Sequence, residues 1–149
     1  MKKSTLLFIC ATLLFACNQS SNKAESNEHD SADQAQTTEL SLNNGAKWKA
    51  DSITNNNVLN LRTIADNFRI KSSPLASDYQ ILSSDLNNAL NKMIQECKMT
   101  GPDHEALHHW LGPILKETNE LKNITDTTVA RTTFKSIDKR LDVYHNYFE

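Results

Sequence analysis

The chain has 149 residues, with 16 Lys and Arg against 18 Asp and Glu, and its formal net charge at pH 7 is −2. Residues 47–149 carry equal numbers of basic and acidic side chains, so they lack the basic footprint that nucleic-acid binding needs. The chain has only three glycines, which leaves no glycine-rich loop for binding phosphates. Nucleic-acid binding and nucleotide binding by such a loop are therefore excluded as functions.

Residues 1–16 have the pattern of a targeting segment. Lys2 and Lys3 supply positive charge, and residues 5–15 form a short and almost wholly apolar run. A helix that spans a membrane needs about twenty apolar residues, so this run is too short to remain as an anchor. We therefore predict that residues 1–16 are a signal peptide.

The end of this segment carries a second motif. Leu14, Ala16 and Cys17 resemble the lipobox of bacterial lipoproteins, in which Leu stands three positions before the Cys and a small residue directly before it. Phe15 departs from the small residue that is usual at its position, and Cys10 does not fit because apolar residues follow it. The resemblance implies cleavage before Cys17 and attachment of lipid to its thiol and new amino group. We expect a lipid anchor in a bacterial membrane, the outer membrane, with the domain facing the periplasm or the cell surface.

Residues 17–46 follow as the lipidated cysteine and a tether. This stretch is rich in Asn, Ser, Gln and Glu, and it has no aromatic residue before Trp48 and almost no large apolar one before Leu40. Such a composition cannot bury enough surface to offset the entropy lost on ordering. We predict a disordered tether that holds the domain away from the bilayer.

Residues 47–149 form one domain with helical periodicity. Apolar residues recur at intervals of three and four in four segments, as Leu82, Leu86 and Leu90 do in the second. Short connections between amphipathic helices favour antiparallel neighbours, so we predict an all-α, antiparallel four-helix bundle with Trp48 packed on one end. The predicted helices are residues 52–70, 74–98, 103–121 and 127–148.

The third predicted helix contains two local signals. Asp103, directly after Gly101 and Pro102, is the expected N-cap. Pro113 has no N–H to donate and clashes with the preceding turn, so we expect the helix to kink or restart after Gly112.

One group of residues has metal-binding chemistry. Cleavage removes Cys10 and lipidation uses Cys17, so Cys97 is the single free thiol of the mature chain. Met99 follows it, and His104 and His108 lie four residues apart on one face of the third helix. We expect both imidazoles to point toward the bundle interior and all four side chains to converge at this helical connection.

The ligand types then favour a metal. Sulfur from Cys and Met together with imidazole selects copper, above all Cu(I), whereas a Cys with two His also suits zinc. Met99 as a ligand favours copper, and Met99 as a packing residue leaves zinc open. We predict a Cu(I) site formed by Cys97, Met99, His104 and His108, with zinc as the less favoured metal.

This stretch resembles a group of small, uncharacterised lipoproteins from Bacteroidota that share a Cys-x-Met and a His-x-x-x-His on a helical hairpin. The resemblance implies a metal-related role in the cell envelope and no established activity. The matching residues are Cys97, Met99, Gly101, His104, Leu107 and His108.

Two functions from different classes follow. The first is a lipoprotein that sequesters, senses or transfers Cu(I), alone or with a metal-handling envelope protein as its partner. The second is a structural or protein-interaction lipoprotein without metal, in which Cys97 is a buried apolar residue and the histidines are polar surface. A thiol on a bundle stripe lacks the accessible, electropositive setting of a reactive cysteine, so we expect no enzyme.

Overall fold

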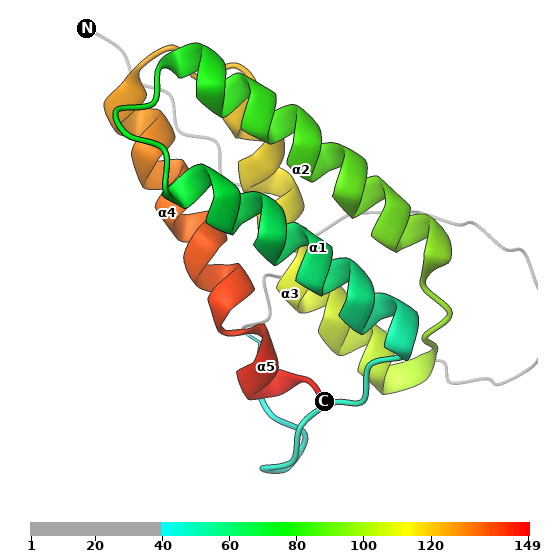
Figure 1. The fold of residues 1–149 in the computed structure, drawn as a ribbon. Coiled ribbons are helices and arrows are strands. Elements are labelled where there is room, and N and C mark those ends of the chain that lie inside the picture. Colours follow the sequence, from blue (N-terminus) through cyan, green and yellow to red (C-terminus); the bar gives the residue numbers. More distant parts are fainter. Residues whose placement is uncertain (1–39) are drawn as a thin grey trace, which may run out of the picture. The chain divides into compact units, whose positions relative to one another are not determined.

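A computed structural model describes residues 40–149, and within this range the chain is all-helical, as the sequence predicts. Figure 1 shows the helices arranged as a bundle. The predicted signal peptide, Cys17 and most of the predicted tether lie outside the described residues. The helices are α1 (Ser52–Arg69), α2 (Ala76–Glu96), α3 (Gly101–Leu121), α4 (Thr127–Asp142) and the single-turn α5 (Tyr144–Tyr147).

The four long helices alternate in direction. The α1–α2 connection and the start of α4 lie at one end of the bundle, and the C-terminus lies at the other end (Figure 1). Each long helix packs on the next, and α4 also packs on α1 and α2, which closes the bundle. The prediction of an antiparallel four-helix bundle is confirmed.

The apolar stripes meet in one core. Leu61, Leu86, Leu90, Ile114 and Ile137 are all fully buried, as their three-and-four spacing predicts. Aromatic rings fill both ends of the bundle. Phe68 packs on Tyr79 and Phe134 at one end, and Trp110 and Phe148 pack on Tyr144 at the other.

The helix boundaries follow local hydrogen bonds more than the extent of the stripes. Asp51 caps α1 by accepting from the Thr54 N–H at 2.6 Å. The second helix is shorter than the predicted 74–98, because the Asp78 carboxylate bonds to the Leu75 N–H and fixes the start, and Cys97 already has extended backbone. The fourth predicted helix is interrupted at Val143, where the N–H turns back to the carbonyl oxygens of Leu141 and Lys139.

α3 continues through Pro113 as one helix and does not restart there, while the alternative of a kink stays a prediction. The expectation for the start of this helix needs correction. Its N-cap is Thr100, so Asp103 is not the cap but lies in the first turn. The Asp103 carboxylate accepts instead from the Lys49 N–H at 2.9 Å, a partner 54 residues away in the chain.

The segment before α1 belongs to the domain. The Trp48 N–H donates to the Tyr147 carbonyl at 2.8 Å, the Glu149 N–H donates to the Trp48 carbonyl at 3.0 Å, and the Trp48 indole packs partly buried against the core. Leu40 also packs on the core, and the Trp48 indole N–H donates to the Ser41 carbonyl. Packing of Trp48 on one end is confirmed, and ordered contacts extend back to Leu40, inside the stretch expected to be tether.

Candidate metal centre

The connection between α2 and α3 carries the two predicted sulfur ligands. Cys97 is the residue after α2; its N–H donates to the Met93 carbonyl and its side chain is half-buried against the core. Met99 is 9% exposed and is part of the hydrophobic core. Met99 is therefore a packing residue. Without Met99 as a ligand, the predicted set of Cys97, His104 and His108 suits zinc as well as copper.

The first turns of α3 position the two histidines. The glycine at 101 has a φ of +67°, in the left-handed region that side chains avoid, and this lets the chain turn directly from the connection into the helix. His104 and His108 then lie one turn apart on the same face. Their Nε2 atoms are 3.0 Å apart and share one hydrogen bond, and the ring centroids are 4.4 Å apart with the planes at 76°.

This pair lies at the surface. His104 is half-buried and His108 is exposed, so the expectation that both imidazoles point into the bundle is wrong. The apolar stripe of α3 runs through Leu107, Leu111 and Ile114, and His108 lies beyond its margin. The two Nε2 atoms are still close enough for one ion to replace the proton that they share.

Electrostatics favour the metal-binding protonation state of His108. Burial lowers the pKa of His108, and the neighbouring charges of His104 and His109 lower it further. At neutral pH the His108 imidazole is therefore neutral. Neutral imidazole is the form that binds a metal ion.

Cys97 is not grouped with the histidines. The residue after it is held at the start of α1, where the Lys98 N–H donates to the Asp51 carboxylate at 3.1 Å. Among residues 40–149, no three His, Cys, Asp or Glu side chains are grouped so that they could hold a metal ion. The structure brings His104 and His108 together and does not add Cys97 to them.

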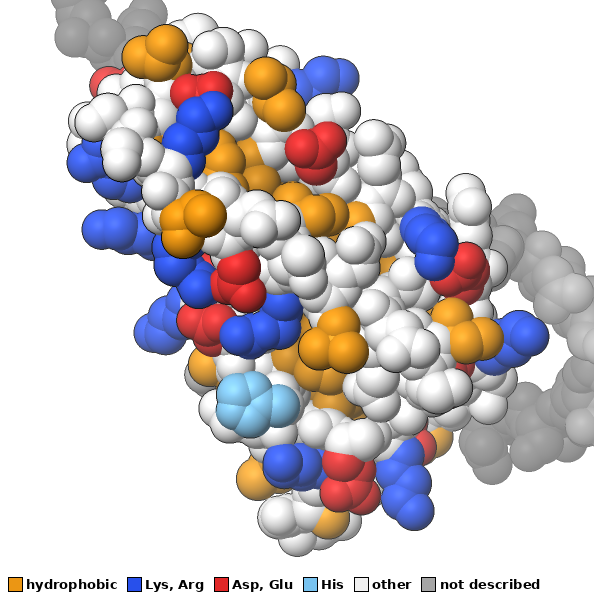
Figure 2. Space-filling view, in the orientation of Figure 1, with side chains coloured by type: hydrophobic (Ala, Val, Ile, Leu, Met, Phe, Trp, Pro, Cys, Tyr) orange, Lys and Arg blue, Asp and Glu red, His pale blue; other side chains and the backbone are white. Residues whose placement is uncertain are grey.

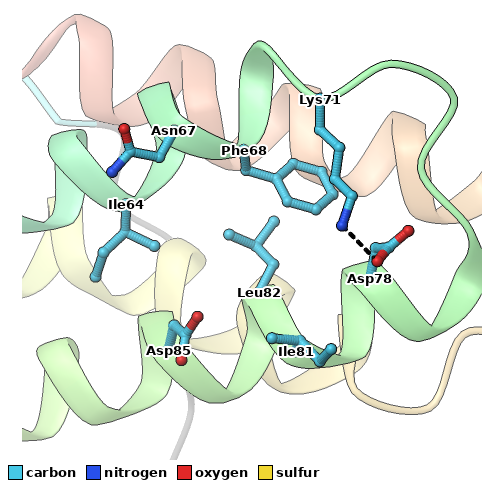
Figure 3. A pocket seen from close by; sticks show the side chains of 8 residues that line it. All are labelled: Ile64, Asn67, Phe68, Lys71, Asp78, Ile81, Leu82 and Asp85. Carbon is cyan, nitrogen blue, oxygen red and sulfur yellow. Dashed lines mark hydrogen bonds and ion pairs between the residues drawn. The ribbon is translucent and has the colours of Figure 1, made fainter.

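A hollow between α1 and α2 is a feature that the sequence analysis missed. Figure 2 shows hydrophobic side chains along the furrow between these helices, and Figure 3 shows Phe68 and Leu82 facing the hollow, with the Lys71–Asp78 ion pair at one edge. Its volume of about 270 Å³ lies just below the range of typical small-molecule pockets. Ile81, 61% exposed and outside the core stripe of α2, was the signal that could have indicated it.

Comparisons with family models, with curated proteins and with solved structures found no match for this chain. Within residues 40–149, none of the helices has the length and apolar character needed to cross a membrane.

Proposed function

We propose that this protein is a lipid-anchored lipoprotein of the bacterial envelope whose helical domain binds copper, and that it acts by binding rather than by catalysis. The lipobox-like residues that end at Cys17 support the anchor, and the two paired histidines of α3 support the metal site. The domain would sequester, sense or transfer the ion, alone or with a metal-handling envelope protein.

The observation that carries the metal-binding proposal is the 3.0 Å separation between the Nε2 atoms of His104 and His108. Metal–nitrogen bonds to histidine are about 2.0–2.1 Å long, so one ion can reach both atoms without a change of backbone. Because both rings project from consecutive turns of one helix, the chelate is largely assembled before the ion arrives.

A complete Cu(I) site also needs sulfur. Cys97 and Met99 are on the α2–α3 connection, whose residues 97–100 lie outside helices and strands. Moving the Met99 side chain out of the core would cost about 1.5–3 kcal/mol. A four-ligand structural metal site contributes about 10–16 kcal/mol, measured for zinc. Metal binding could therefore offset the rearrangement that brings both sulfur atoms to the histidines.

The test is a competition titration. The mature chain, with Cys97 kept reduced, is titrated with Cu(I) against a chromophoric chelator, and one ion per chain should bind. Cys97→Ser and His108→Ala should each weaken binding about tenfold or more, since changes even to outer partners of a metal site cost about 10–100-fold. His145→Ala, on an exposed residue of α5, is the matched control and should have no effect.

The opposite result is equally clear. If the wild type and the double variant Cys97→Ser with His108→Ala hold Cu(I) with the same affinity, the four-residue copper site is wrong. The interaction lipoprotein without metal then becomes the better proposal. The hollow beside Ile81, lined by apolar and polar residues in equal number, and the exposed Ile70 and Leu75 support it, because exposed apolar surface is common at protein-binding sites.

A further inference from the structure

The histidine pair of α3 has a spacing that is compatible with chelation of one ion. With metal–nitrogen bonds of about 2.0–2.1 Å, two nitrogen atoms 3.0 Å apart subtend about 91–97° at the ion. This is close to the right angle between neighbouring ligands in square-planar or tetragonal coordination, the geometry that nitrogen-bound Cu(II) and Ni(II) adopt. A tetrahedral zinc ion, with ligand angles of about 109°, would place the two atoms about 0.3 Å further apart, which small rotations of the two rings can supply. The preference for Cu(II) therefore rests on its higher affinity for nitrogen ligands than that of zinc.

The surroundings of the pair favour the same ions. Cu(I) selects soft sulfur ligands, but Met99 is packed in the core and the half-buried Cys97 packs against it. The pair formed by His104 and His108 offers a metal ion imidazole nitrogen ligands and no sulfur. Binding an ion requires both protons on Nδ1, and this breaks the hydrogen bond between the two Nε2 atoms and leaves both lone pairs for the ion.

The exposure of the pair determines the remaining coordination. His108 is exposed and His104 is half-buried, and no other His, Cys, Asp or Glu of the described domain completes a three-ligand group. Water or a ligand from a partner must therefore fill the other positions around a bound ion. A two-ligand, solvent-facing site releases its ion more readily than a closed four-ligand site, which suits exchange more than storage.

We propose that His104 and His108 form an open chelate for a divalent ion of the Cu(II) and Ni(II) class, with two neighbouring positions supplied by the protein and the rest left to solvent or to a partner. The inference rests on the proposed function in using the same histidines as a metal site. It requires neither sulfur ligand and no movement of the α2–α3 connection.

The test uses the mature full-length chain in detergent and two probe ions, Cu²⁺ and Ni²⁺, in separate calorimetric titrations at pH 7.5. Each ion should bind at one site per chain that depends on both histidines. His104→Ala and His108→Ala should each weaken binding about tenfold or more. Mutation of a residue that only supports a metal ligand costs about 10–100-fold in affinity, and loss of the ligand itself should cost at least the lower end of that range. The electron paramagnetic resonance spectrum of bound Cu²⁺ should show tetragonal coordination with two imidazole nitrogens.

Matched controls separate this chelate from other donors. His109→Ala and His145→Ala remove exposed imidazoles of the same domain, and His29→Ala removes the remaining histidine of the chain; none should change binding. Cys97→Ser and Met99→Leu should also leave Cu²⁺ and Ni²⁺ affinity unchanged, although both should weaken Cu(I). Circular dichroism of each variant checks that the helices are retained.

The outcomes distinguish the two proposals. Binding of Cu(I) that depends on Cys97, with no divalent binding at the histidines, would overturn the open chelate and leave the proposed function standing. Divalent binding that needs both histidines and is indifferent to Cys97 supports the chelate even where the Cu(I) titration fails. Divalent affinity that is the same in the wild type and in the His104→Ala, His108→Ala double variant would overturn the chelate.

Discussion

At the residue scale, Asp51 connects two parts of the candidate site region. One carboxylate oxygen accepts from the Thr54 N–H at 2.6 Å and so caps α1, while the other accepts from the Lys98 N–H at 3.1 Å. Burial alone would raise the pKa of Asp51, but the hydrogen bonds from Thr54 and Lys98 outweigh it and hold the pKa below its ordinary value of 3.8. This single side chain therefore fastens the chain after Cys97 to the start of the bundle.

The sign of the pH dependence follows from that lowered pKa. Stability from Asp51 is fully present above the pKa of the unfolded chain and is lost as the pH falls through the lower pKa of the folded state. Asp51→Ala should lower the free energy of unfolding at pH 6 by about 1–2 kcal/mol through loss of the cap. The difference between wild type and variant should shrink as the pH falls below 4, as urea unfolding across this range would measure.

Asp126 supplies the matched control for Asp51. Its carboxylate caps α4 by accepting from the N–H groups of Thr128 and Val129, with no other partner among residues 40–149. Asp126→Ala should cost less than Asp51→Ala, because it leaves no cross-connection unpaired. Equal losses in the two variants at pH 6 would show that the Lys98 hydrogen bond adds nothing to stability.

At the element scale, α3 is the helix that carries the histidine pair and also contains the pair Gly112-Pro113 in its interior. A proline disfavours helical backbone in the residue before it, partly through a clash with that residue's Cβ. Gly112 has no Cβ, and this explains why the helix can continue through Pro113. The same glycine costs helix stability, because its backbone loses more entropy than that of alanine.

A double-mutant cycle tests this explanation. Pro113→Ala should raise the free energy of unfolding by about 1–3 kcal/mol, since it restores a donor to the carbonyl of His109 and removes a ring from the helix interior. Gly112→Ala should add about 0.5–1 kcal/mol in the Pro113→Ala chain, where nothing lies within 4 Å of the new Cβ. In the wild-type chain the same substitution should give no gain, as thermal or urea unfolding would measure. A gain from Gly112→Ala that is equal in both backgrounds would contradict the role given to Gly112.

At the scale of the whole molecule, membrane attachment and metal binding are assigned to different parts of the chain. The described domain has no helix that could cross a membrane, and the proposed anchor is the lipid on Cys17. The described residues begin at Leu40, which packs on the core.

The anchor has a direct test. Cys17→Ala should abolish lipid attachment, so that the protein accumulates as unprocessed precursor or as soluble chain, since the predicted signal peptide is too short to span as an anchor. Fractionation and the mobility of the precursor on a gel measure this. Cys10→Ala, within the apolar run, should be processed normally. Cys17→Ala protein that is cleaved after the signal and still tightly membrane-held would rule out the lipid anchor.

The sequence by itself determined the helical class and the apolar faces that form most of the core. The periodic spacing of Leu86, Leu90 and Ile137 identifies apolar faces, and these faces are buried when the helices pack against one another. The pairing of His104 with His108 also follows from sequence, because residues four apart meet on any helix.

Only the tertiary structure decided the surroundings of these residues. Met99 became part of the core, and His108 fell outside the buried stripe, because the exposure of a residue at the margin of a helix face depends on how the neighbouring helices are rotated and spaced. Asp103 does not form the expected cap, and its carboxylate accepts a hydrogen bond from the Lys49 N–H, 54 residues away in the chain. No local sequence pattern predicts a partner at that separation. Periodicity therefore predicts which faces are buried, whereas the position of Cys97 relative to the histidines depends on contacts between helices.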